Sequence, residues 1–224
     1  MNLVDTFFNW EILVISIPAL LRGLLMTVVL GVMGIVFGTL AGLGVCMVRL
    51  YAPKPLRWLA VAYIDLLRAT PILVVLILIY YALPFLDIRL SSMTSAGLAM
   101  SLVMAAYSAE IFRSGIESVP GGQTEAANAL GLSFFQQFRH VVLPQAWRIV
   151  IPPLTGTWVS LIKDTSLAST VALPELLKEA LDAQAYHANP TPLIGAAIIY
   201  VLLLLPLVRL VGLLEKRANR STRR

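Results

Sequence analysis

The stretch GLLMTVVLGVMGIVFGTLAGLGVCMV, residues Gly23–Val48, runs for 26 positions without a charged side chain. A helix needs about 20 apolar residues to cross the hydrocarbon core of a bilayer, so this run is long enough to span a membrane. The rest of the chain has the same character, since 58% of its 224 residues are hydrophobic and 13% are charged. Soluble domains carry about 25% charged residues. The sequence therefore predicts a membrane protein and excludes a soluble globule or a disordered chain.

Four further apolar stretches follow the first one. Together they predict an all-α membrane protein, a single domain over residues 1–224 with transmembrane helices at about 17–47, 59–84, 92–112, 147–168 and 192–213. If the chain crosses five times, twelve of the seventeen Lys and Arg residues fall on one side and Arg89, Lys163 and Lys178 on the other. Basic loops stay in the cytoplasm. We therefore expect the N-terminus outside and the C-terminus in the cytoplasm.

The remaining composition excludes several kinds of chemistry. Five basic residues crowd into Lys216–Arg224, which indicates a cytoplasmic tail near anionic lipid headgroups rather than a nucleic-acid partner. Cys46 is the single cysteine, so no intrachain disulfide is expected. His140 and His187 are isolated in the sequence, so no metal site is expected. No lysine follows a glycine, so the chain has no phosphate-binding GxxxxGK loop and cannot be a conventional P-loop ATPase.

Two segments are expected to pack helices together. Gly34, Gly38 and Gly42 lie on one stripe of the first span, where small residues let a second backbone approach closely. This stripe fits packing within the subunit or a seam between two copies. Residues Pro174–Leu181 predict a short amphipathic helix on the outer face, with Pro174 at the first helical position and Glu175 near the positive helix end.

The loop over residues 114–144 is polar for this chain yet rich in helix-forming residues. A short helix over Gln123–Leu130 is expected, with Gly131 at its C-terminal cap. Ser133 and Gln136 have the spacing of a capping box, which predicts a second short helix that ends before Pro144. The segment between Gln123 and Gln137 has no basic residue, unlike helices that lie on a membrane surface. It therefore fits better as a docking element for a partner.

The loop also resembles a known family. Glu125-Ala126-Ala127, then Gly131, Val141 and Leu143-Pro144, is similar to the EAA loop of ABC importer permeases, with Val141 where isoleucine is commoner. Elsewhere in the chain, RATP at 68–71, AYSAEIFR at 106–113, GIESVP at 115–120 and KDTSL at 163–167 resemble the permeases of polar amino-acid importers, of the histidine, glutamine and glutamate type. The resemblance covers nearly the whole chain, including five helices and an outside N-terminus.

The resemblance implies a transport subunit that is not itself an enzyme, in a bacterial inner membrane. The coupling loop would contact a cytoplasmic dimer of ABC ATPase subunits through Glu125, Ala126, Ala127, Gly131, Leu143 and Pro144. ATP and magnesium would be bound by that partner, and no cofactor by this chain. The other implied partners are a second permease subunit, identical or similar, and a periplasmic or lipid-anchored solute-binding protein. The bilayer surrounds the assembly, and the substrate would be a polar amino acid.

Charged residues at membrane depth are costly and are candidates for function. Asp65 with Arg68, and Glu110 with Arg113, have the spacing of ion pairs on one helix face near the inner membrane surface. Snorkelling of these side chains to the membrane interface explains both pairs better than a role in substrate binding does. Lys163, Asp164, Thr165 and Ser166 form a polar patch in the fourth span, which could offer a zwitterionic amino acid both charges and hydroxyl groups. The patch could equally hold helices together. Adjacent residues point about 100° apart on a helix and need not share a ligand.

Two other classes of protein remain open at this point. A transporter or channel driven by an ion gradient often shows inverted repeats, which five unequal helices do not display. A membrane scaffold would leave the polar patch at Lys163–Thr170 without a purpose. Coupling to ATP separates the first of these from an ABC importer, and measured flux separates both transporters from the scaffold.

Overall fold

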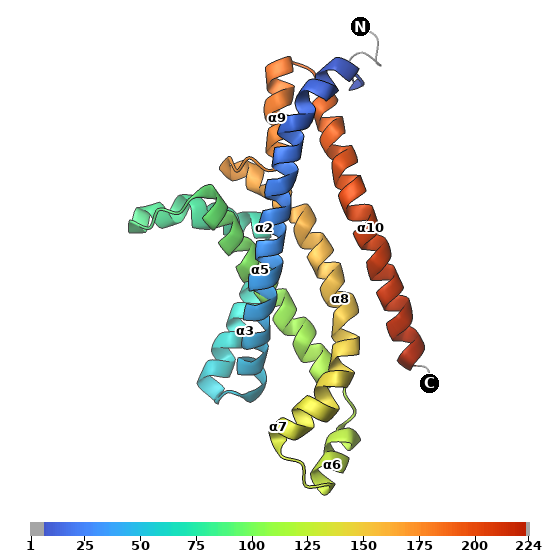
Figure 1. The fold of residues 1–224 in the computed structure, drawn as a ribbon. Helices are drawn as coiled ribbons and strands as arrows, with labels where there is room; N and C mark the ends of the chain where they lie inside the picture. The colour runs from blue at the N-terminus through green and yellow to red at the C-terminus, as the bar shows by residue number, and fades with distance from the viewer. Residues whose placement is uncertain (1–6, 223–224) are drawn as a thin grey trace.

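The computed structural model describes residues 7–222, and all regular structure in this range is helical. The long helix α2 (Trp10–Tyr51) runs along most of the molecule. Two short helices, α6 (Gly121–Ala129) and α7 (Phe134–Gln137), lie at one end, and α9 (Leu176–His187) lies at the other end beside the start of α2 (Figure 1). The fold therefore separates two small helical elements at opposite ends of a bundle of longer helices.

The longer helices correspond to the five predicted spans. They are α2, α3 (Lys54–Ala69) with its continuation α4 (Ile72–Ile77), α5 (Ser92–Glu117), α8 (Leu143–Asp164) and α10 (Thr191–Thr222). By length and hydropathy, candidate spans are α2, α5 and the Thr191–Leu214 part of α10, and α3 with residues 72–86 would be a fourth if the bent pair counts as one span. The helix α8 is not among them. The fold is thus all-helical, with three or four helices that meet the criterion for crossing a membrane.

The prediction of one continuous helix over 59–84 is wrong. The helix breaks at Thr70 and Pro71, and the two halves meet at 105°. Proline disfavours the helical conformation of the residue before it and has no N–H for the helix ladder. Thr70 accordingly adopts extended backbone angles, φ −98° and ψ 129°. In Figure 1 the segment after the break projects sideways from the bundle, through α4, a π-helical turn and a 3-10 turn that ends at Leu86.

The helix predicted over 147–168 also has different bounds. It begins earlier, at Leu143, and regular α-helix ends at Asp164, where a 3-10 segment over Thr165–Val171 takes over. The outer helix α9 starts at Leu176, two residues after the predicted start at Pro174, because the Glu175 side chain caps it by accepting hydrogen bonds from the first backbone N–H groups.

The glycine stripe of α2 packs inside this subunit. A Cβ atom at Gly34 would lie 2.9 Å from Leu161 of α8 and 3.1 Å from Met100 of α5. One at Gly38 would overlap the Met104 side chain of α5. Of the two interpretations left open by the sequence, the structure supports packing within the subunit, since α5 and α8 occupy the stripe.

The end of the bundle near α9 is held together by a buried carboxylate. Glu175 is fully buried, and it accepts hydrogen bonds from the Leu177 N–H, the Lys178 N–H and the Tyr200 hydroxyl at 2.8–2.9 Å. The Leu176 N–H donates to Thr27 Oγ1 of α2 at 3.1 Å. These contacts fix α9 against both α2 and α10.

Candidate functional site

The loop between α5 and α8 folds into two short helices joined at a glycine, as the sequence predicts. Gly131 has φ +73°, and the Gly131 and Leu132 N–H groups donate to the carbonyls of Asn128 and Ala127. This is the Schellman arrangement that ends helices at a left-handed residue. The Ser133 N–H donates to Gln136 Oε1 at 2.8 Å, which completes the predicted capping box of α7.

The two helices form a braced unit with an exposed apolar surface. The Gln137 amide donates to Asn128 Oδ1 and to the Leu132 carbonyl, which ties α7 to the end of α6. The Phe134 ring meets Tyr51 at the end of α2 edge-on, with centroids 5.2 Å apart. Phe134 and Phe135 nevertheless expose 63% and 66% of their surface. In water such aromatic side chains are typical of a surface that another protein covers.

Not all residues predicted to contact an ATPase are accessible on this unit. Glu125, Ala126, Gly131, Leu143 and Pro144 are exposed. Ala127 is buried, with 2% of its surface accessible, and packs inside the unit rather than facing a partner. The exposed Phe135 is not among the residues that the sequence analysis proposed for a partner contact.

A cluster of charged residues lies between this unit and the centre of the bundle. The predicted Glu110–Arg113 ion pair is present, and Glu110 also contacts Arg49 of α2 at 2.5 Å and Arg68 of α3 at 3.9 Å. Among the described residues the predicted Asp65–Arg68 pair is absent. The reason is that α3 ends directly after Arg68 and the bend turns this side chain toward α5, where its guanidinium lies 5.7 Å from the centre of the Tyr107 ring.

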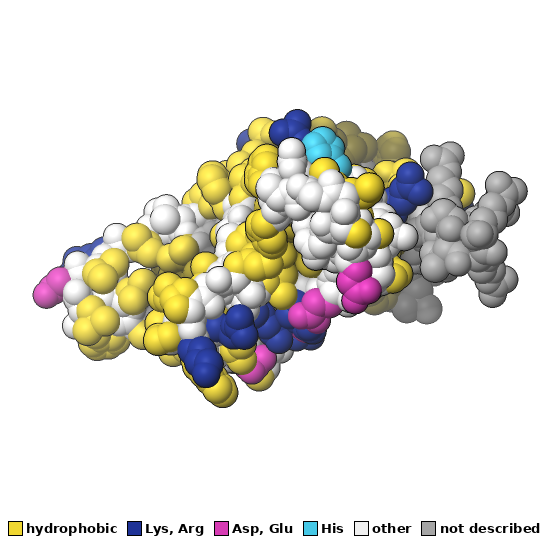
Figure 2. Space-filling model, turned by 90° about the horizontal axis from the view of Figure 1, so that it is seen from below, with side chains coloured by type: hydrophobic (Ala, Val, Ile, Leu, Met, Phe, Trp, Pro, Cys, Tyr) yellow, Lys and Arg dark blue, Asp and Glu magenta, His cyan; other side chains and the backbone are white. Residues whose placement is uncertain are grey.

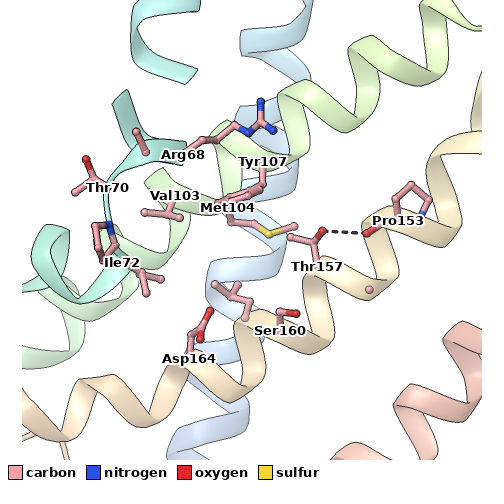
Figure 3. Close-up of a pocket in the computed structure, with 14 residues that line it drawn as sticks. Arg68, Thr70, Ile72, Val103, Met104, Tyr107, Pro153, Thr157, Ser160 and Asp164 are labelled. Atoms are coloured by element: carbon pink, nitrogen blue, oxygen red, sulfur yellow. Dashed lines mark hydrogen bonds between the residues drawn. The ribbon is translucent and has the colours of Figure 1, made fainter. Parts of the chain in front are cut away.

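A cavity of about 640 Å³ opens where the α3–α4 bend faces α5 and α8. Its lining consists of Arg68, Ala69, Thr70, Pro71, Ile72, Val103, Met104, Tyr107, Pro153, Gly156, Thr157, Ser160, Leu161 and Asp164. Figure 3 shows Thr157, Ser160 and Asp164 on one face of α8, directed at the cavity, with Arg68 beside Tyr107 on the opposite side. Spacings of three and four residues bring side chains to one helix face, which explains how α8 supplies three polar groups.

The break between α3 and α4 brings polar groups to one wall of the cavity. A continuous helix would present only side chains, whereas the bend brings Arg68, Thr70 and the backbone around Pro71 to the cavity. The Thr70 hydroxyl donates to the Leu66 carbonyl at 2.8 Å, and the Thr70 N–H donates to the same carbonyl at 3.1 Å, so two hydrogen bonds hold the end of α3. Behind the cavity, Leu161 and Met104 rest on the glycines of α2.

Of the four residues predicted for a substrate pathway, only Asp164 lines the cavity. Lys163 is exposed on another face of α8. The hydroxyls of Thr165 and Ser166 donate to the carbonyls of Ile162 and Lys163, each three residues earlier. The hydroxyl-bearing residues that line the cavity with Asp164 are Thr157 and Ser160, which lie earlier on α8. The sequence signal for them is their helical spacing of three and four residues, from 157 to 160 and from 160 to 164.

The buried Glu175 is a second polar feature that the sequence did not reveal as buried. Burial raises the pKa of its carboxyl above the ordinary value of 4.5, while hydrogen bonds from Leu177, Lys178 and Tyr200 act in the opposite direction. The hydrogen bonds of this carboxylate join the start of α9 to Tyr200 of α10, which holds α9 in place.

The chain is similar in sequence and in structure to known proteins. Residues 34–220 match a family model described as "Binding-protein-dependent transport system inner membrane component". The chain is 42% identical to a probable amino-acid ABC transporter permease protein of Bacillus subtilis over 79% of this chain and 78% of the relative. It is 37% identical to the L-cystine transport system permease protein of the same organism, over 97% and 94% of the two chains. A crystal structure of an amino acid ABC transporter with histidines superposes with a TM-score of 0.85 at 32% identity, covering 91% of this chain and 96% of the other.

Proposed function

The chain belongs to the family of binding-protein-dependent transport system inner membrane components, and from this premise we infer that it is the permease subunit of an amino-acid ABC importer. It is a transport subunit and not an enzyme, and in such importers ATP hydrolysis belongs to a separate partner. What this chain contributes is a route through the membrane and a contact through which the ATPase can act on that route.

The cavity is the observation that supports amino-acid passage. An α-amino acid carries a carboxylate and an ammonium group, and Arg68 and Asp164 offer one partner to each from opposite sides of the same space. Charge-assisted hydrogen bonds of this kind are the strongest that side chains make. The volume of about 640 Å³ lies within the range typical of sites that bind small molecules. We assign the solute site to Arg68 and Asp164, with Ser160 beside them, and place Lys163, Thr165 and Ser166 outside it.

The α6–α7 unit is assigned to the ATPase contact. It projects from one end of the bundle (Figure 1), exposes Glu125 together with Phe134 and Phe135, and is braced by hydrogen bonds so that a push on it reaches α8 directly. The continuous chain from α7 through a π-helical turn into α8 links this contact to Asp164 at the far end of the same helix.

The topology proposed for the membrane has five crossings, with α3 and its bent continuation counted as one and α8 as the fourth. Lys and Arg side chains are spread over the face seen from the α6–α7 end (Figure 2), where the positive-inside rule places the cytoplasm. The start of α2 and α9 then lie outside, and the C-terminus lies in the cytoplasm. The location that follows is a bacterial inner membrane.

The remaining partners follow from this assignment. Two ATPase subunits, which bind ATP and magnesium, dock at the cytoplasmic end, and a solute-binding protein delivers the amino acid at the α9 end. The cavity holds charged groups and is open on one side, and lipid cannot cover Arg68 and Asp164 without a high cost. A second permease subunit is the cover that we propose.

The test exploits the exposed carboxylate of the α6–α7 unit. Purification of the tagged permease from its own membranes is expected to bring along an ATPase, and Glu125→Lys is expected to abolish both this association and ATP-driven amino-acid uptake while membrane insertion stays intact. Glu11→Lys, the same reversal at an exposed position on the opposite end, serves as the control and should keep the ATPase. Normal uptake in the Glu125→Lys protein would overturn the assignment of the ATPase contact.

A further inference from the structure

The charges that line the cavity are balanced. Arg68 and Asp164 are the charged residues of the lining, and the other members are apolar, aromatic or hydroxyl-bearing. Figure 3 shows the two charged side chains on opposite sides of the space, with Val103 and Met104 between them. A ligand that spans the cavity therefore meets a cation at one side and an anion at the other.

The positive charge of Arg68 is still available for a ligand. The neighbouring ion cluster contains three guanidinium groups, of Arg49, Arg68 and Arg113, but only two carboxylates, of Glu110 and Glu117. Arg49 and Arg113 make the close contacts to Glu110, whereas Arg68 remains 3.9 Å away and exposes 41% of its side chain. The cluster is thus one negative charge short, at the guanidinium that borders the cavity.

The negative charge of Asp164 is likewise available. Among the side chains that the structure describes, none forms an ion pair with Asp164. The adjacent Lys163 is exposed and does not line the cavity, as expected for neighbours that point about 100° apart on a helix. One carboxylate and one guanidinium are therefore left for the ammonium and carboxylate groups of an amino acid.

The hydroxyl groups of the cavity determine which hydrogen bonds the side chain of the ligand can form. The Thr70 and Thr157 hydroxyls donate their protons to the carbonyls of Leu66 and Pro153 at 2.8 and 2.9 Å. Their oxygens can consequently offer only lone pairs to the cavity. The Ser160 hydroxyl makes no hydrogen bond to another described residue, so it can donate as well as accept.

We propose that this cavity selects amino acids whose side chain is uncharged and carries hydrogen-bond donors, as a carboxamide does. Once Arg68 and Asp164 hold the α-carboxylate and α-ammonium groups, a third charge on the ligand has no counter-charge, and an unpaired charge away from water is costly. An amide N–H₂ group can instead donate to Thr70 or Thr157, and its carbonyl can accept from Ser160. This inference rests on the proposed function and narrows its substrate class.

Direct binding to the permease–ATPase complex in lipid nanodiscs tests the selection without the solute-binding protein. The probes are radiolabelled L-glutamine, its charged isostere L-glutamate, and L-lysine. We expect L-glutamine to bind at least tenfold more tightly than either charged amino acid. N-acetyl-L-glutamine and 4-aminobutanamide lack the ammonium and the carboxylate group respectively, and both are expected to bind at least tenfold more weakly than L-glutamine.

A change of the charge balance should change the preference in a defined direction. Ser160→Asp adds a second carboxylate to the cavity, so the affinity ratio of L-lysine to L-glutamine is expected to rise at least tenfold, whereas Ser160→Ala should weaken L-glutamine without favouring L-lysine. Tighter binding of L-glutamate or L-lysine by the unaltered complex would overturn the proposed selection. ATP-driven uptake of those amino acids would meanwhile leave the proposed function standing. Loss of ATP-driven uptake of every amino acid would instead refute the function itself.

Discussion

The packing of α2 against α5 permits a quantitative prediction for Gly42→Ala. A methyl group at Gly42 would lie 2.6 Å from Ser108 Cβ, 2.7 Å from the Ala105 carbonyl oxygen and 3.1 Å from the Ala109 nitrogen. Two of these neighbours are backbone atoms, so a change of rotamer cannot relieve the overlap. The carbonyl contact falls about 0.7 Å short of the 3.4 Å at which ordinary contact begins, and the two helices must move apart to restore it.

The cost follows from the competition of two effects. Overpacking of this kind costs typically about 1–3 kcal/mol, whereas alanine is favoured over glycine inside a helix by about 0.8–1.0 kcal/mol. The difference is about 0–2 kcal/mol. Because two of the three overlaps are with backbone atoms, we expect the upper half of this range, a net loss of about 1–2 kcal/mol, which at this chain length lowers the apparent Tm by roughly 2–8 °C. The matched control is Gly44→Ala on the same helix, where an added Cβ meets no other atom within 4 Å. Here the helix propensity acts alone, and the apparent Tm should stay the same or rise.

The single cysteine provides the assay. Cys46 is fully buried one helical turn after Gly42, so a fluorogenic maleimide will react with it only when the α2–α5 contact opens. Labelling of the isolated permease in detergent during a temperature ramp then reports on the contact that Gly42→Ala disturbs. If Gly42→Ala labels at the same temperature as Gly44→Ala, the backbone approach inferred here is not the contact that stabilises the two helices.

Three further predictions concern other parts of the chain. Because burial raises the pKa of Glu175, the folded state holds the carboxyl proton more tightly than the unfolded state does. The contribution of Glu175 to stability is therefore largest below its ordinary pKa of 4.5 and declines as the pH rises above that value. Glu175→Gln should remove this decline, measured as apparent Tm against pH. Gly131→Ala forces an L-residue to φ +73° at a cost of about 1–2 kcal/mol, and should weaken retention of the ATPase in pull-downs without a change in Cys46 labelling. Glu110→Ala leaves Arg49 and Arg113 without their shared carboxylate. The loss of a hydrogen bond to a charged group costs about 1.5–3 kcal/mol of stability, so the apparent Tm should fall. An unchanged Tm would show that the ion cluster does not stabilise the fold.

Local signals in the sequence were sufficient where the chain itself supplies the partner. The helix end at Gly131 and the capping box at Ser133 involve residues within five positions of each other, and both were predicted. Apolar length predicted α2, α5 and α10, which meet the criterion for crossing a membrane, since hydropathy does not depend on how helices pack. The family resemblance then supplied the proposed ATPase-coupling role, which the spacing of residues does not indicate.

The features that were not predicted from the sequence depend on contacts between segments that are distant in the chain. Pro71 was visible in the sequence, but a proline can either kink a span or break it, and the local sequence does not show which of the two occurs. Arg68 has Asp65 at helical spacing yet turns to Glu110, because the bend at Thr70 reorients the end of α3. The sequence placed Glu175 near the positive end of the outer helix but did not indicate that it is buried, because its burial depends on the packing of α2 and α10 around it.

The glycines of α2 have a consequence for how substrate preference can change. Gly34 and Gly38 never reach the cavity, yet Leu161 and Met104, which form part of its wall, rest directly on them. A single added carbon on α2 would push that wall inward and reshape the space from behind. A selection for permeases with altered solute preference should therefore yield changes on α2, whose outer side chains are exposed in this subunit, as well as changes among the residues that touch the solute.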